Sequence, residues 1–333
     1  MEFLGRLVLD APAAVLSWLG RQGTRAVAAL IVIGIVTPSL GALFKPFVTE
    51  AVFVLLCIAF LRVDIAAFRI YLGRPAIVLA AAAWTSLVIP ALLGASYLAF
   101  GLENQSPDLF LALVLQAIAS PLMAAPAFAA LIGLDATLVL CTMVTSTALL
   151  PFTAPLFAHA FIGPALTLTP LALGLKLFAI LAGSALVGFT VRRIAGLTAI
   201  ERQEEMINGF NILVLFVFIV PVMESVAPRF LATPMITIGL VALAFVVFFA
   251  VLFLTTLLFT SAGRERALTL GFMAAQRNVG LMLAATGGAL PDLTWLYFAF
   301  CYFPIYLSPL LLQPLVRRII AQQILRSRER SFP

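Results

Sequence analysis

Long apolar runs restrict the fold of this chain more than any other feature. Runs longer than about 18 residues, enough to form a membrane-spanning helix, recur through the sequence. Hydrophobic residues make up 63% of the chain and charged residues only 10%, whereas a soluble domain carries about 25% charged residues. The short alternating segments typical of a membrane β-barrel are not found in the sequence. The sequence therefore predicts an all-α polytopic membrane protein.

The apolar runs divide into ten predicted transmembrane helices within a domain of residues 26–320. These cover residues 26–43, 47–61, 76–100, 109–134, 136–162, 165–191, 207–226, 234–260, 267–290 and 293–316. Residues 1–25 mix apolar residues with Arg and Asp, which indicates an amphipathic segment on the membrane surface. Residues 321–333 form a basic tail.

The basic residues predict the orientation of the chain in the membrane. With ten spans, both termini lie on the same side, and sixteen of the 20 Lys and Arg residues fall there. Only Lys45 and Arg229 fall on the other side, while Lys176 and Arg277 lie within spans. Because cytoplasmic loops carry an excess of Lys and Arg, we expect cytoplasmic termini. This placement also argues against nucleic acid as a partner, and the preference for Arg over Lys favours a bacterial inner membrane.

The ninth predicted span is interrupted near its middle by Gln276, Arg277 and Asn278. At about 1.5 Å per residue, Arg277 lies roughly 15 Å from the start of this span, near the midplane of a ~30 Å hydrocarbon core. A charge at that depth costs from about 3 to more than about 10 kcal/mol, which makes Arg277 a candidate functional residue. The alternative is an arginine that is paired structurally or extends to an interface.

The fourth predicted span is interrupted as well, by Pro121 and Pro126 after Ser120. If the ten spans form two halves of five, the ninth span is the fourth of the second half and matches the fourth span of the first. Because each half has an odd number of spans, the two halves have opposite orientations in the membrane. Interrupted helices at matching positions indicate a transporter binding site. We therefore predict two inverted five-helix repeats in which broken helices 4 and 9 cross. Two simple proline kinks are the alternative.

Other polar residues within the spans have both a functional and a structural interpretation. Thr142 and Thr145 either line a cavity or form ordinary hydrogen bonds between helices. Lys176 either attracts an anion as a second buried cation or extends its flexible stem to the interface. No embedded His, Cys or carboxylate pair is placed for catalysis, so we expect neither an enzyme nor a bound cofactor.

Three stretches, residues 75–102, 119–157 and 264–284, resemble the third, fourth to fifth, and ninth spans of the bile acid:sodium symporter family. The likeness rests on segments such as ASPLMAAPAF and AAQRNVG. The resemblance implies a panel of helices 1, 2, 6 and 7 and a core of helices 3, 4, 5, 8, 9 and 10. It also implies an organic anion bound between panel and core, reached alternately from each side.

The chain departs from the family where sodium would bind. Met273 stands where the family has a ligating Glu, Arg277 where it has a Gln, and Met143 where it has a Thr. Sodium requires oxygen ligands, which thioethers cannot supply, and a guanidinium would repel the ion. We therefore expect no metal site, with Arg277 supplying the positive charge that sodium supplies in the family.

These observations predict a secondary transporter of a small or amphipathic organic anion. A conventional sodium-coupled symporter is one alternative, and a transporter-like receptor that binds its ligand without moving it is another. We expect the substrate to contact Arg277, Asn278, Gln276, Ser120, Pro121, Pro126, Thr142, Thr145 and Lys176.

Overall fold

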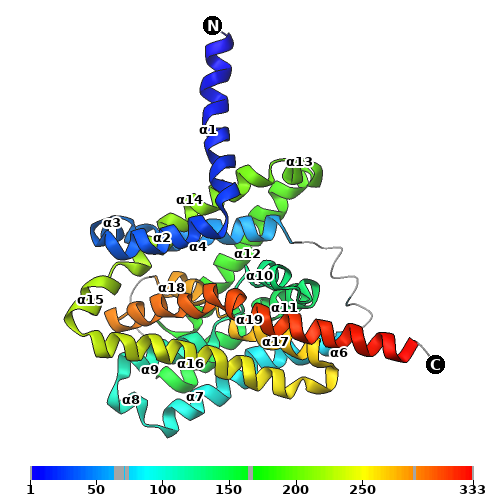
Figure 1. The fold of residues 1–333 in the computed structure, drawn as a ribbon. Coiled ribbons are helices and arrows are strands. Elements are labelled where there is room, and N and C mark those ends of the chain that lie inside the picture. The colour runs from blue at the N-terminus through cyan, green and yellow to red at the C-terminus, as the bar shows by residue number, and fades with distance from the viewer. Residues whose placement is uncertain (1, 64–70, 72–74, 164–167, 288–289, 332–333) are drawn as a thin grey trace. The chain divides into compact units, whose positions relative to one another are not determined.

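The computed structural model describes residues 2–63, 71, 75–163, 168–287 and 290–331, with residues 2–11, 24 and 320–331 described by their backbone alone (Figure 1). Within these residues every regular element is a helix, and one isolated antiparallel bridge joins Pro121 to Arg277.

The first half of the chain contains helices of widely different length. Its elements are α1 (Glu2–Gln22), α2 (Thr24–Val36), α3 (Pro38–Phe44), η1 (Lys45–Phe47), α4 (Val48–Leu61), α6 (Pro75–Ala83), η2 (Trp84–Val88), α7 (Ile89–Ala99), α8 (Leu102–Gln105), α9 (Pro107–Ile118), α10 (Ala125–Ile132), α11 (Ala136–Phe157) and η3 (Ala158–Ile162). Of these, η1 is a 3₁₀ turn, whereas η2 and η3 are π-helical turns.

The second half begins with a long helix and ends with the longest. Its elements are α12 (Pro170–Ala195), α13 (Leu197–Arg202), α14 (Glu204–Met223), α15 (Val226–Ala232), α16 (Pro234–Leu258), the 3₁₀ turn η5 (Thr260–Ala262), α17 (Arg264–Ala275), α18 (Val279–Thr286) and α19 (Asp292–Ser331).

Seven helical segments of the described chain are long and apolar enough to cross a membrane. They are Pro38–Leu61, Pro75–Ala99, Ala136–Ile162, Pro170–Ala195, Glu204–Ala232, Pro234–Leu258 and Asp292–Ile319. An eighth is added if Pro12–Gln22 and Arg25–Val36, which meet at a bend of 93°, are counted as one span. The chain is thus a polytopic helical membrane protein. Each of the fourth and ninth predicted spans is divided into two short helices.

The predicted boundary between the first two spans is wrong. Helix α2 ends at Val36, and a continuous helical segment of 24 residues then runs from Pro38 to Leu61. Proline fits the first turn of a helix, where its missing N–H leaves no bond unmade, so Pro38 begins the new helix. Pro46 is accommodated in the same way, because η1 tightens the backbone into a 3₁₀ turn there.

The described chain divides into two compact units. Unit 1 contains Met1–Val63, Phe178–Pro234 and Leu283–Leu290, and unit 2 contains Asp64–Leu177, Met235–Met282 and Pro291–Pro333.

Helix α14 is the centre of unit 1, where it contacts α1, α2, α3 and α4 (Figure 1). The contact with α1 depends on two glycines without side chains. A Cβ atom at Gly20 would lie 1.9 Å from the carbonyl oxygen of Glu205, and one at Gly209 would lie 1.8 Å from that of Leu16. Backbone therefore packs directly on backbone, and the ion pair between Arg21 and Glu205, at 2.9 Å, lies beside this contact.

Unit 2 surrounds its interrupted helices with long ones. Helix α11 contacts α6, α10 and α17, while α9 contacts α7 and α19. The Asp135 side chain caps α11 by accepting a hydrogen bond of 2.9 Å from the Leu138 N–H. In α17 every residue from Ala267 to Ala275 is buried, which is expected of a helix enclosed by others.

Gly209→Ala is expected to weaken the contact between α1 and α14. Its new methyl group meets a backbone oxygen that cannot move without the helix, so the free energy of unfolding should fall by about 1–3 kcal/mol. Thermal unfolding of the detergent-solubilised protein measures the change. Gly239→Ala in α16 is the control, since nothing lies within 4 Å of the added Cβ. Equal stability of both variants would contradict the backbone contact.

Candidate functional site

Two interrupted helices pair through their breaks in unit 2. Helix α9 ends at Ile118 and α10 begins at Ala125, whereas α17 ends at Ala275 and α18 begins at Val279. The Leu122 N–H donates to the Gln276 carbonyl oxygen at 2.6 Å, and the Asn278 N–H donates to that of Ser120 at 2.8 Å. These two bonds flank the bridge between Pro121 and Arg277. Each break thus provides one donor and one acceptor for backbone groups of the other break that have left their helices.

The residues of the two breaks explain where the helices stop and resume. Pro121 has no N–H to continue α9 and lies in the bridge. Pro126, predicted to lie within the interruption, is instead in the first turn of α10, where its missing N–H removes no helical bond. Asn278 directly precedes α18, and its Oδ1 accepts a hydrogen bond of 3.1 Å from the Leu281 N–H, as an N-cap does.

Arg277 is buried at the pairing point, with only 3% of its surface exposed. Its Nη1 donates to the Ala119 carbonyl oxygen at 2.8 Å and to the Thr85 carbonyl oxygen at 3.3 Å. Its Nε and Nη2 are buried and have no hydrogen-bond partner among the described residues. Neither of the ion pairs found in the described chain involves Arg277. The guanidinium therefore binds backbone oxygens through one nitrogen and leaves the opposite edge unpaired.

The Thr85 carbonyl oxygen is available because of a π-helical turn followed by a proline. In η2 the Ile89 N–H donates to the Trp84 carbonyl oxygen. In an α-helix the same N–H would donate to the Thr85 carbonyl oxygen, which therefore loses its usual donor here. The next N–H in register would come from residue 90, which is proline. Thr85 was not predicted from the sequence. A proline in the middle of the third predicted span was the available signal.

Gln276 is held by a second residue that the sequence analysis missed. Its Nε2 donates to the Ser308 Oγ of α19 at 2.8 Å, while its Oε1 is buried without a partner in the described structure. Ser308 in turn donates to the Ile305 carbonyl oxygen at 2.8 Å. Gln276 thus connects the break between α17 and α18 to α19, while its Oε1 can still accept a hydrogen bond.

Several buried hydroxyls of unit 2 also have no hydrogen-bond partner within the described chain. They belong to Thr85, Tyr97, Ser120, Thr142, Ser146 and Thr147. Tyr97 lies within electrostatic range of Arg277. Thr145 differs, because its Oγ1 donates to the Cys141 carbonyl oxygen of its own helix at 2.8 Å. The structural interpretation thus accounts for Thr145, whereas the hydroxyl of Thr142 is free to bind something else.

Of the two interpretations of Lys176, its exposure favours the stem that extends to the interface over a second buried cation. Lys176 lies on α12 as an exposed residue, between exposed Leu175 and buried Leu177. A lysine on the outer face of a membrane helix extends its stem along the surface toward the polar layer. Its assignment to the substrate site remains a prediction without structural support.

The residues around the Arg277 guanidinium do not fit a sodium ion at that position. Met273 is fully buried and offers a thioether, which is a poor ligand for a hard cation. The Thr85 and Ala119 carbonyl oxygens, which could otherwise ligate a cation, accept hydrogen bonds from Arg277. The guanidinium thus takes up these oxygens and repels a second cation from them.

Comparison of the sequence with protein-family models and with curated proteins gives no match. The fold class, a polytopic helical membrane protein, therefore rests on the sequence and the structure together.

Asn278→Ala is expected to lower the free energy of unfolding by about 1 kcal/mol, because α18 loses its N-cap acceptor. Asn278→Ser keeps a side-chain oxygen at the cap and should retain most of the stability. Denaturant or thermal unfolding of the two variants measures the difference. An alanine variant as stable as the serine variant would contradict the capping role.

Proposed function

We propose that this protein is a secondary transporter that moves a small or amphipathic organic anion by alternating access, with Arg277 as the principal substrate-binding residue. The proposal includes ten membrane spans in two inverted repeats, in a bacterial inner membrane, with both termini in the cytoplasm. Substrate binds where the interrupted helices α9–α10 and α17–α18 pair.

The unpaired edge of Arg277 is the observation that carries the proposal. Nε and Nη2 point two N–H donors in one direction, which is the geometry that binds both oxygens of a carboxylate or sulfonate. Buried donors without partners are costly, more so when charged. An anion at this edge would satisfy both donors and neutralise the guanidinium. Pairing in a dry site is also stronger than in water.

Polar atoms near the breaks favour an oxyanion that also has hydrogen-bonding groups. Ser120 Oγ and Gln276 Oε1 belong to the two paired segments and have no partner in the described structure. The hydroxyl can donate to an anionic oxygen, and the amide oxygen can accept from a substrate hydroxyl or amine. Together with Arg277 they would orient the ligand.

Arg277 also supports transport without sodium. In a sodium-coupled site, oxygen atoms would hold a cation beside the substrate anion. Here the Thr85 and Ala119 carbonyl oxygens instead accept hydrogen bonds from Arg277 Nη1. The positive charge is thus covalently attached and always present. We propose that binding of the anion does not depend on sodium.

The architecture supports alternating access. If α2, α9–α10 and α17–α18 are counted as spans beside the seven long ones, the chain has ten. Both helix breaks fall in unit 2, whereas the segments before residue 64 and between 178 and 234 belong to unit 1. Since Arg277 is 3% exposed, substrate can reach it only when the packing around it opens.

Arg277→Ala is expected to abolish saturable uptake of the substrate anion into proteoliposomes, because both donors and the charge are lost. Arg277→Lys keeps the charge but not the paired donors and should weaken apparent affinity about tenfold or more. Uptake of radiolabelled candidate carboxylates and sulfonates is the measurement. Arg317→Ala, which removes an exposed arginine of α19, should transport normally.

Two outcomes would contradict the proposal. Normal uptake by Arg277→Ala would remove Arg277 from the substrate site. If the wild-type protein binds an anion in equilibrium dialysis but never carries it into the vesicles, it is a receptor rather than a transporter.

A further inference from the structure

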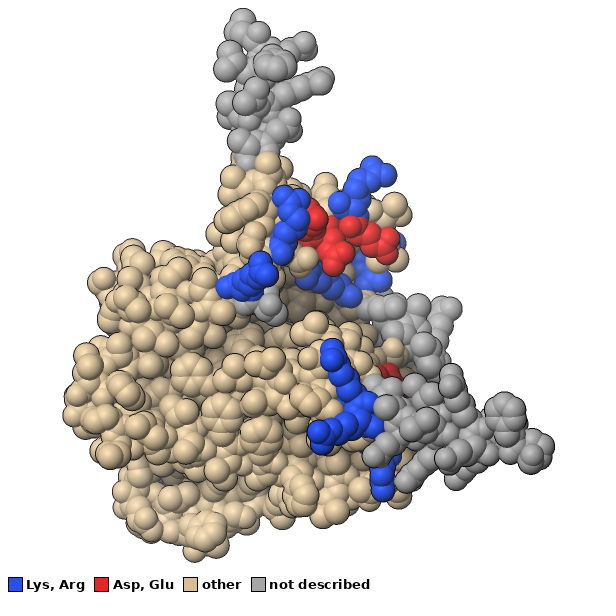
Figure 2. All heavy atoms as spheres, viewed as in Figure 1, with Lys and Arg blue, Asp and Glu red and all other residues tan. Residues whose placement is uncertain are grey.

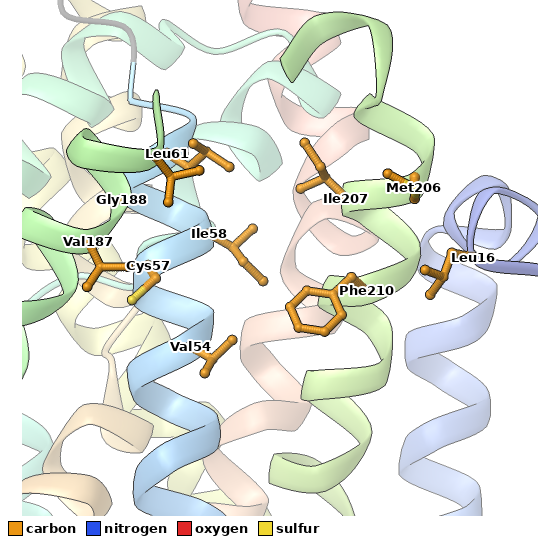
Figure 3. A pocket seen from close by; sticks show the side chains of 11 residues that line it. Leu16, Val54, Cys57, Ile58, Leu61, Val187, Gly188, Met206, Ile207 and Phe210 are labelled. Carbon is orange, nitrogen blue, oxygen red and sulfur yellow. The ribbon is translucent and has the colours of Figure 1, made fainter. Parts of the chain in front are cut away.

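Unit 1 contains an apolar groove that takes no part in the proposed transport site. It has a volume of about 370 Å³, within the usual range for ligand sites. Its lining residues come from α1, α4, α12 and α14 (Figure 3), and they are Leu16, Val54, Cys57, Ile58, Leu61, Val187, Gly188, Val191, Met206, Ile207 and Phe210. The lining carries no charged side chain, so the groove itself suits a hydrocarbon chain.

Helix α12 approaches α4 closely on one side of the groove, and α14 lies on the other side. A Cβ atom at Gly188 would lie 2.7 Å from the Cys57 carbonyl oxygen, which shows that α12 packs on the backbone of α4. Across from them, Figure 3 shows Ile58 on α4 and Ile207 and Phe210 on α14 extending into the space between the two helices. The groove thus lies between α4 and α14, beside the packed pair of α4 and α12.

Two arginines mark one end of this groove. Arg62 follows the lining residue Ile58 by four positions, and Arg192 follows Gly188 by four, so each lies near the face of its helix that lines the groove. Arg192 Nη1 donates to the Val63 carbonyl oxygen, which holds its guanidinium beside the end of α4.

Acidic residues lie at the same end but do not neutralise it. Glu204 is within electrostatic range of Arg62, and Glu205 is already paired with Arg21 at 2.9 Å. Figure 2 shows basic and acidic side chains gathered over the part of unit 1 where α13 meets α14. Arg192 has no acidic partner within 4.0 Å in the described chain and is left to attract an anion.

We propose that this groove binds one anionic phospholipid, with an acyl chain along the lining and the phosphate at Arg62 and Arg192. The apolar lining matches the acyl chain, and the arginines match the headgroup, since basic residues at a membrane surface attract anionic lipids. The lipid would join α4, α12 and α14 and so stabilise unit 1. This inference does not depend on the proposed transport function.

Native mass spectrometry of the detergent-exchanged full chain tests the proposal, with phosphatidylglycerol and phosphatidylcholine of identical acyl chains as probes. The wild type should retain one phosphatidylglycerol with about fivefold or greater preference. Arg62→Gln should lower this preference by about fivefold, whereas Arg317→Gln, which removes an exposed arginine of unit 2, should leave it unchanged. Equal retention of both lipids by the wild type would overturn the proposal.

A pair of tryptophan variants tests the location. Val187→Trp places a bulky ring in the groove and should abolish retention of the lipid. The neighbouring Leu186→Trp, which changes an exposed residue outside the lining, should not. If Val187→Trp retains lipid as the wild type does, the groove is not the site.

Cysteine labelling gives an independent measurement on the unaltered chain. Cys57 lines the groove and is half-buried, whereas Cys141 and Cys301 are buried. Phosphatidylglycerol should slow labelling of Cys57 by a small apolar thiol reagent, and phosphatidylcholine should slow it less. Labelling that is insensitive to phosphatidylglycerol would contradict the proposal.

Discussion

The pairing of two helix breaks is the interaction on which the rest of unit 2 depends. Within a membrane, backbone groups that leave a helix must find partners in protein or water, because each unsatisfied group costs several kcal/mol. Here the break before α10 and the break before α18 bond to each other on both sides of Pro121 and Arg277. Two further carbonyl oxygens, of Ala119 at the first break and of Thr85 in η2, accept hydrogen bonds from the guanidinium. A cationic side chain thereby contributes hydrogen bonds to backbone oxygens beside the breaks.

The same arrangement connects structure to the proposed function. If Arg277 only completed the backbone, one nitrogen would be enough, and the buried Nε and Nη2 would be an uncompensated cost. Under the proposed function, an anion that pairs with Nε and Nη2 would remove this cost, and the gain would favour its binding. The lipid proposed for unit 1 belongs to a separate part of the chain and would act on stability rather than on substrate recognition.

The sequence predicted the class of fold and both interruptions, because apolar length, prolines and a charged residue at mid-span are local signals. It failed where the outcome depends on helical register or on neighbours. Thr85 becomes an acceptor only because a π-helical turn precedes Pro90. Both Pro38 and Pro46 could begin a helix, and the boundary between the first two spans depends on which of them does. The sequence left two interpretations of Lys176 open, because its apolar neighbours in sequence do not indicate which face of α12 is covered.

The most direct test of the central claim is thermal stabilisation of the purified wild-type protein by organic anions, measured in sodium chloride and in choline chloride. If Arg277 supplies the positive charge permanently, a carboxylate or sulfonate that binds should raise the melting temperature equally in both salts. Stabilisation by sodium alone, or an anion effect that requires sodium, would contradict this account and indicate a conventional sodium-coupled symporter.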